Sequence, residues 1–466
     1  MQQVWARFKQ FNKVWDARFE DITKETWLRT TYRDFSAGLI VAMTAIPMAM
    51  GFAMAMGLRP EQGIIAGALA CLIGRTWGGS KYQVYGPTAA FIPIIAALMA
   101  KYGEAGGGSF AQGHGFLVLC SMIAGVVLMG AGLLGLGRFA RLVPSSIVVG
   151  FTVGIGVSIA LANAGDMFGL HTVSGGAFAR LRAIVTHLGD ANWYALALAV
   201  LTFGLTRGLL KVSIFIPAPL LALGISTLLT ATLWTGKGIT LVRDRFGAIP
   251  NNFFVFTPPS LPGFDVGVAF DILYFVFAIV FVSGIESLLC SSMADRLAGN
   301  RGTPFNPDKE FWGQGLVQLI TPLINGFPCT GALARTATSI KAGALTPLAG
   351  YFKGGLKLLM AYYVAPYLES VPMACIGGIL FWVATNMIKP AEIREVIAHG
   401  RAHTVLMIYT AVMVPTTDFL TGVLSALLIY AVGKRLAGRK IVPNVPALEV
   451  PSLVESFGEY TERKSA

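Results

Sequence analysis

Two charged residues stand in stretches that otherwise have the composition of membrane-embedded sequence. Glu286 lies in the run FVFAIVFVSGIESLLCSSMA, and Arg335 follows the glycine-rich run NGFPCTGALA. An ionisable group inside a bilayer is costly, so it normally faces a cavity or a partner and marks the path of a substrate or an ion. We interpret both residues as marks of a transport path rather than of an enzyme anchored to lipid.

The composition indicates a polytopic helical membrane protein. Of the 466 residues, 55% are hydrophobic and 13% are charged, whereas soluble domains have about 25% charged residues. Apolar runs of about 20 residues, long enough to cross the hydrocarbon of a bilayer, recur along most of the chain. The formal net charge of +12 is explained by membrane topology. No compact basic domain is evident, so we expect no binding of nucleic acid.

Neither a metal site nor a cofactor site is predicted. The five cysteines and five histidines are scattered along the chain, and no pair has the spacing of zinc ligands. We also find no pairing of a nucleophile with a base, so we do not expect the protein to be an enzyme.

Fourteen apolar segments are predicted, several of them short or broken by Gly and Pro. Lys and Arg are enriched at the cytoplasmic ends of membrane helices, and the first 33 residues carry seven of them. An even number of segments returns the C-terminus to the side of the N-terminus, so we expect both termini in the cytoplasm. The segments begin near residues 35, 61, 86, 116, 144, 192, 213, 267, 311, 331, 347, 371, 404 and 418.

Residues 1–33 are predicted to form a cytoplasmic amphipathic segment. Trp5, Phe8, Trp15 and Phe19 interleave with basic residues there. This pattern suits a helix that lies in the membrane interface, and it suits equally a segment that docks on the protein itself.

Two segments differ from the others because each combines an extended start with a short helix. They are YQVYGPTAAFIPIIAAL, residues 82–98, and NGFPCTGALARTATSIKAG, residues 325–343. Paired interrupted segments at matching places in two halves of a chain indicate a midplane binding site. A helix that begins in mid-membrane leaves its first N–H groups unpaired, and its positive dipole end attracts anions. With Arg335 on the second short helix, the pair predicts an anion site.

These residues resemble the SulP family of inorganic anion transporters and exchangers over about residues 30–436. The run DFSAGLIVAMTAIPMAMGFAMAMGL is similar to the family's opening signature, and SKYQVYGPTAAF is similar to the motif of its third helix. The stretch GIESLLCSSMADRLAGNR, followed by GQGL and GALART, resembles its most specific region. PSSIVVGFTVGIG and MACIGGILFWVATNMI also fit, in the right order.

The resemblance implies a fold that the composition does not show. The family has an all-α architecture of two inverted repeats of seven helices, with the third and tenth segments as half-helices. Helices 1–4 and 8–11 form a core domain that carries the anion past a gate domain, and the gate domain anchors a homodimer. For this chain the resemblance implies a transport domain over 34–436, with a core of about 34–137 and 267–366 and a gate of about 144–235 and 369–436.

The resemblance also implies the residues of the site. The anion would lie between the N-terminal ends of the third and tenth helices, with contributions from the first helix and with Glu286 as the coupling residue. By motif position the substrate-binding residues would be Thr88, Ala89, Ala90, Phe91, Gly331, Ala332, Leu333, Ala334, Arg335, Pro47 and Met48.

Three departures from the family pattern bear on mechanism. Met48 stands where many members have Gln, which removes one polar contact. Cys290 and Leu333 replace threonines that accompany an Asp in the sodium-coupled branch, and hard cations need such oxygen ligands. Glu286 therefore either carries a proton or pairs with Arg335. The third departure is the short cytoplasmic tail, residues 437–466, where most members continue into a STAS domain.

We therefore predict a secondary active transporter of small inorganic anions, with sulfate or bicarbonate as first candidates, in the plasma membrane. Its expected partners are the anion, the lipid bilayer and a second copy of the chain, without a cofactor. A nucleobase–cation symporter shares the repeat architecture but needs carboxylates to read base edges. An anion channel would have the same pore chemistry without alternating access.

Overall fold

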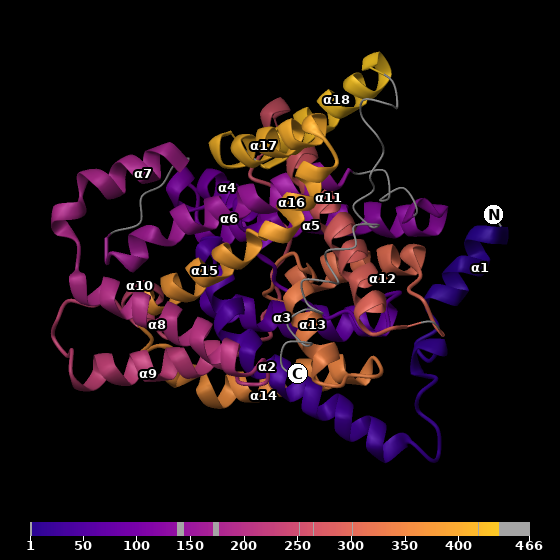
Figure 1. The fold of residues 1–466 in the computed structure, drawn as a ribbon, viewed down its shortest axis with the longest axis horizontal. Coiled ribbons are helices and arrows are strands. Elements are labelled where there is room, and N and C mark those ends of the chain that lie inside the picture. The colour runs from indigo at the N-terminus through magenta and orange to yellow at the C-terminus, as the bar shows by residue number, and fades with distance from the viewer. Residues whose placement is uncertain are drawn as a thin grey trace.

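The protein is mostly helical (Figure 1), and the described residues include one two-stranded sheet, β1–β2. The computed structural model describes residues 2–137, 144–170, 177–250, 252–263, 265–300, 302–417 and 419–437. Most of the predicted tail, from residue 438 onward, lies outside these residues.

The fourteen predicted segments are present in the predicted order. The first begins at Trp27 rather than near residue 35. In the first half they are α2 (Trp27–Ala55), α3 (Pro60–Trp77), β1 (Tyr85–Gly86) with α4 (Ile92–Tyr102), α5 (Phe110–Leu134), α6 (Ser145–Met167), α8 (Trp193–Val212) and α9 (Ala218–Thr232). In the second half they are α11 (Val266–Leu297), α12 (Pro307–Leu323), β2 (Thr330–Gly331) with α13 (Leu333–Lys341), α14 (Leu348–Leu368), α15 (Met373–Met387), α17 (Arg401–Thr416) and α18 (Phe419–Ala437).

α1 (Gln2–Phe11) lies in the predicted N-terminal amphipathic segment. Short helices that the sequence analysis did not predict connect the later segments: α7 (Ala177–Thr186), α10 (Val242–Phe246) and α16 (Pro390–Ala398). Figure 1 shows α7 to α10 at one end of the molecule and α1 and α12 towards the other.

The sequence defines the ends of individual helices by capping. Ser109 begins α5 with a capping box, in which its hydroxyl accepts from the N–H of Gln112 and the amide oxygen of Gln112 accepts from the N–H of Ser109. The same helix ends at Gly135, whose φ of 78° is left-handed and favours glycine. Local sequence therefore fixes where the polypeptide enters and leaves this segment.

The outer surface of the bundle is that of an integral membrane protein. Six of the described helical stretches could span a bilayer by length and hydropathy alone: α2, α5, α6, α8, α11 and Met373–Ala398. Large apolar side chains also stay exposed on the outside of the bundle, which in a soluble protein would be an aggregation hazard. Examples are Val200, Leu228, Phe270, Leu273, Leu359 and Leu428.

The helices pack in pairs that recur between the two halves of the chain. α5 packs on α12, and the matching segments α14 and α3 pack on each other. Likewise α6 packs on α17, and their counterparts α15 and α8 are in contact. Two seven-segment repeats predict this pattern, and the all-α fold of fourteen segments is confirmed.

Reciprocal glycines bring α5 and α12 into backbone contact. A Cβ atom on Gly125 would lie 2.6 Å from the carbonyl oxygen of Gly315, and one on Gly315 would lie 2.5 Å from that of Gly125. Small residues allow such close approach between membrane helices. This contact places α12 directly beside α5, which packs against α4, the helix that follows β1.

The N-terminal segment contacts the rest of the protein, which is one of the two alternatives left open by its sequence. Phe11 and Phe19 are buried, and the Arg18 guanidinium donates to the carbonyl oxygens of Arg75 and Gly78 at the C-terminal end of α3. A basic side chain that satisfies the last carbonyls of a helix acts as a C-cap. The segment therefore clamps the chain immediately before it enters β1.

Candidate functional site

The two broken segments meet in an antiparallel ladder. Tyr85 pairs with Gly331, and Gly86 pairs with Thr330. The N–H of Ala332 extends the ladder by donating to the carbonyl oxygen of Val84 at 2.8 Å. Because the strands run in opposite directions, the short helices that follow them leave the ladder on opposite sides. The structure thus brings together two stretches from the two halves of the chain, as predicted.

Both short helices begin without a side-chain cap. The first begins at η2 (Ala89–Phe91), which continues into α4, and its N-cap is Thr88. The second is α13, and its N-cap is Ala332. Since the first N–H groups of a helix have no partner within the helix, each start presents free donors and the positive end of a dipole. These are the features of an anion-binding helix terminus.

Thr88 could cap the helix it begins, but its hydroxyl is used elsewhere. The hydroxyl donates to Oε2 of Glu286 on α11 at 2.9 Å. A threonine at this position would normally accept from the N–H of Ala90 or Phe91. The N–H of Phe91 donates to the carbonyl oxygen of Thr88 at 3.4 Å, so the N–H of Ala90 is the group that the missing side-chain cap leaves to a ligand. Glu286 is held beside the start of the first half-helix as a consequence.

Arg335 lies in the first turn of α13 and is buried. Its Nη2 donates to the carbonyl oxygen of Pro87, which directly precedes Thr88. Its Nη1 is buried without a hydrogen-bond partner. A guanidinium nitrogen buried in this way carries a desolvation penalty that an anionic ligand would remove.

The structure does not pair Glu286 with Arg335. Among the described residues, no ion pair within 4.0 Å joins these two side chains. The sequence left two roles open for Glu286, that of a proton carrier and that of a partner for Arg335. The geometry does not show the second.

The other predicted binding residues surround the same ladder. Ala89, Ala90 and Phe91 form η2, and Gly331 is the second residue of β2. Pro47 and Met48 lie within α2, which packs against both α4 and α13. Most of these residues are buried, but four keep an accessible surface: Met48, Glu286, Leu333 and Ala334.

The sequence analysis missed two lysines that lie behind the ladder. Lys353 and Lys357 lie four residues apart on α14, and they are 1% and 0% exposed. Nζ of Lys353 donates to the carbonyl oxygen of Tyr85 in β1 at 2.7 Å. The signal was the same as for Glu286, namely charges within the apolar run YFKGGLKLLMAYY.

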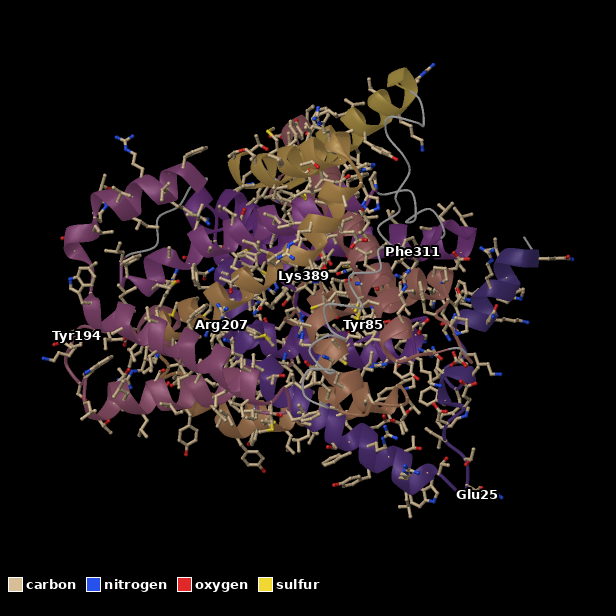
Figure 2. All side chains as sticks on the ribbon, in the orientation of Figure 1. Glu25, Tyr85, Tyr194, Arg207, Phe311 and Lys389 are labelled. Atoms are coloured by element: carbon tan, nitrogen blue, oxygen red, sulfur yellow. The ribbon has the colours of Figure 1, made fainter. Side chains whose placement is uncertain are left out.

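Glu310 on α12 was missed as well, and it fixes the strand that leads into the site. Five groups donate to its carboxylate, although the residue is fully buried. The donors are the N–H groups of Gly79 and Ser80, the side-chain amide of Gln83 and the hydroxyls of Tyr85 and Ser287. Figure 2 places Tyr85 near the middle of the molecule, whereas Glu25 and Tyr194 lie at its edges.

The arrangement offers no site for a metal ion. Within the described ranges, no group of three or more His, Cys, Asp or Glu side chains could hold one. The uncapped helix starts and the Arg335 guanidinium are groups suited to binding an anion.

Comparison with known proteins identifies the family. The model of the sulfate permease family matches residues 32–410. The chain belongs to this family. It is 33% identical over 414 residues to "Putative sulfate transporter YvdB" of Bacillus subtilis, and the match covers 88% of this chain and 75% of that protein. It is 28% identical to the bicarbonate transporter BicA of Picosynechococcus, over 79% of this chain and 63% of that protein.

Solved structures of the family share the fold. The transmembrane domain of a cyanobacterial bicarbonate transporter, BicA, superposes with a TM-score of 0.72 at 23% identity, over 86% of this chain and 98% of that chain. SLC26A9 superposes with a TM-score of 0.77 at 16% identity, over 89% of this chain and 66% of that chain. The relatives of this chain in the sulfate permease family are transporters. The chain is therefore a multi-pass membrane protein that transports anions, and it is not an enzyme.

Proposed function

We propose that the protein is a secondary active transporter that binds a small inorganic oxyanion, of the sulfate or bicarbonate class, between the two half-helices. The observation that carries this proposal is the pair of uncapped helix starts held by the β1–β2 ladder, with Nη1 of Arg335 buried and unpaired. The free N–H groups bind the oxygens of the anion, and Arg335 supplies a full positive charge.

The grouping of the helices supports the proposal of alternating access. The half-helices, α2, α3, α5, α11, α12 and α14 pack mainly on one another, and α6, α8, α9, α15, α17 and α18 form a second group. We assign the first group to the moving core and the second to the gate, as in an elevator mechanism. The plasma membrane location with both termini in the cytoplasm and the homodimer remain predictions that belong to this proposal.

Glu286 couples the anion to a proton in this scheme. Its carboxyl group contacts the start of the first half-helix through Thr88, and it keeps an accessible surface. A carboxyl group so placed can exchange a proton with water while it senses the occupancy of the site. The variant Glu286→Gln is therefore expected to transport anions without a response to a proton gradient.

The proposal is tested by counterflow in proteoliposomes. Proteoliposomes that contain the purified protein are loaded with unlabelled sulfate, bicarbonate, chloride or fumarate, and the accumulation of the same labelled anion inside them is measured. Sulfate or bicarbonate is expected to support counterflow, and Arg335→Gln is expected to abolish it. Arg29→Gln is the matched control, because Arg29 is exposed in the first turn of α2. The proposal fails if none of the four anions supports counterflow or if Arg335→Gln behaves as Arg29→Gln does.

A further inference from the structure

Three buried cations gather around one small patch of backbone behind the ladder. A Cβ atom on Gly67 of α3 would lie 2.2 Å from Nζ of Lys357 and 3.0 Å from Cδ of Pro87. A Cβ atom on Gly86 would lie 3.0 Å from Nη1 of Arg335 and 3.5 Å from Cα of Gly67. Gly67 therefore leaves space for the Lys357 ammonium beside α3, and Gly86 leaves space for the Arg335 guanidinium beside β1.

All three cations donate to backbone carbonyl groups. Lys353 contacts Tyr85, Arg335 contacts Pro87, and Nζ of Lys357 donates to the carbonyl oxygen of Gly63 at 3.2 Å. In an extended strand the carbonyls of residues i and i+2 point to the same side. The carbonyl oxygens of Tyr85 and Pro87 are thus held by cations, which keeps their negative ends away from the N–H groups that begin the half-helix.

These cations are not neutralised by the carboxylates nearby. In the described part of the chain, no Asp or Glu lies within 4.0 Å of Arg335, Lys353 or Lys357. Glu286 is the carboxylate bound to the half-helix start. Three cations and one carboxylate give a formal charge of +2, or +3 when Glu286 is protonated. Buried charges normally require compensation, so with both lysines protonated an anion of charge −2 would balance this sum.

We propose that Lys353 and Lys357 set the charge selectivity of the site, so that it favours a doubly charged oxyanion such as sulfate over a singly charged one such as bicarbonate. This inference rests on the proposed anion transport and narrows its substrate class. Lys353 donates to the carbonyl oxygen of Tyr85 in β1 and Lys357 to that of Gly63 in α3, so we assign neither lysine a contact with the anion. They act through the potential that they create there, which low-dielectric surroundings leave largely unscreened.

The electrostatic role predicts a definite relation between two inhibition constants. The Coulomb energy of an anion with a fixed positive charge is proportional to the charge of the anion. Removal of one lysine charge should therefore weaken the binding of both anions. The factor for a divalent anion should be the square of the factor for a monovalent anion. A variant that binds the monovalent anion about threefold more weakly should bind the divalent anion about ninefold more weakly.

Sulfate and perchlorate are the probes, because both are tetrahedral oxyanions and neither changes its protonation near neutral pH. Inhibition of labelled-anion counterflow by each is measured for wild type, Lys353→Gln, Lys357→Gln and the charge-retaining Lys353→Arg. Lys24→Gln is the control, since Lys24 is exposed in the N-terminal segment. Both constants come from one preparation, so a smaller folded fraction changes neither.

The outcomes separate this inference from the proposed function. The inference is supported if at least one glutamine variant shows the squared relation while Lys353→Arg and Lys24→Gln keep nearly the wild-type ratio of the two inhibition constants. It is overturned if the glutamine variants weaken the binding of both anions equally, or if neither glutamine variant changes the binding of either anion. If wild type carries bicarbonate but neither transports nor binds sulfate, the inference fails and the proposed function stands. If no anion supports counterflow, the proposed function itself fails.

A second variant keeps the test open when a lysine replacement does not fold. Gly67→Ala places a methyl group 2.2 Å from Nζ of Lys357. The methyl group also lies 3.0 Å from Cδ of Pro87, but the closest atom is the end of the flexible lysine, which is expected to move away from α3 while it keeps its charge. The binding of sulfate should then be weakened more than the binding of perchlorate. Both effects should be smaller than in Lys357→Gln. Equal effects on the two anions count against the proposal.

Discussion

Thr88 donates its hydroxyl hydrogen to Glu286 on α11, although it occupies the N-cap of the first half-helix. One side chain therefore joins the start of the anion site to the carboxyl group that we assign to coupling. Because of this hydrogen bond the half-helix has no side-chain cap, and the N–H of Ala90 stays open to a ligand.

The first prediction concerns this bond. Thr88→Val keeps the shape of the side chain and removes the donor, so we expect the response of uptake to an inward proton gradient to be largely lost, as in Glu286→Gln. Thr88→Ser keeps the hydroxyl and should retain the response. The measurement is sulfate or bicarbonate uptake into proteoliposomes with and without a pH gradient. A Thr88→Val protein with the wild-type gradient response would refute the link between the two residues.

The second prediction concerns the space that Gly86 leaves for Arg335. A Cβ atom at Gly86 would lie 3.0 Å from Nη1 of Arg335, so Gly86→Ala should displace the guanidinium and lower uptake at least about tenfold. Gly107→Ala is the control for backbone strain, because Gly107 has a φ of 86° and open space around it. It should cost about 1 kcal/mol of stability and leave uptake unchanged. Similar uptake in both variants would contradict the prediction.

The third prediction concerns stability. Glu310→Gln places an N–H₂ group where five donors converge, so at least one donor loses its acceptor inside the protein. We expect the free energy of unfolding to fall by about 3 kcal/mol. Thermal unfolding in detergent measures the change. Glu104→Gln, at an exposed position, should unfold as wild type does. If Glu310→Gln lowered the unfolding temperature as little as Glu104→Gln does, the Glu310 carboxylate would not stabilise the fold as we propose.

The fourth prediction is a pH dependence of the N-terminal clamp. Burial alone would raise the pKa of the Asp16 carboxyl, but hydrogen bonds and charges from Arg18 and Lys309 hold its pKa below the ordinary value of 3.8. Because the folded-state pKa is lowered, the carboxylate stabilises the protein fully above that value, and this contribution is lost as the pH falls through the folded pKa.

The comparison of wild type with Asp16→Asn tests this dependence. The difference in unfolding free energy should be about 1 kcal/mol near pH 7 and should shrink below pH 3.8. Differential scanning fluorimetry across the pH range measures it. A difference that is constant down to acid pH would mean that the Asp16 side chain contributes by packing and not by charge.

Much of the architecture could be predicted from the sequence because a bilayer leaves few alternatives. Apolar runs long enough to cross it must be helices, and the breaks at 82–98 and 325–343 could be recognised by their glycines and prolines. The ladder register could not be predicted, because two-residue strands carry no alternating pattern. The pairing of Tyr85 with Gly331 depends on the packing of α3 against β1 and of α11 against β2, and on the hydrogen bond from Lys353 of α14 to Tyr85.

The site was only partly predictable for a different reason. Glu286 and Arg335 stood out because each is an isolated charge, but their geometry depends on the rotation of α11 and α13, which sequence does not encode locally. Lys353 and Lys357 were overlooked because lysines in a membrane helix commonly extend to the interface. In this protein both point inward, where α3 offers glycines and not bulky side chains.

The central ladder has a consequence for biosynthesis. Val84 and Thr336 are bonded across 252 residues of chain, so the first half-helix has no partner when it leaves the ribosome. At typical rates of synthesis the unpaired strand waits roughly 10–50 s for its complement. During that interval its polar backbone must be shielded by the insertion machinery or by α3, and the nascent protein is exposed to quality control until the second strand arrives.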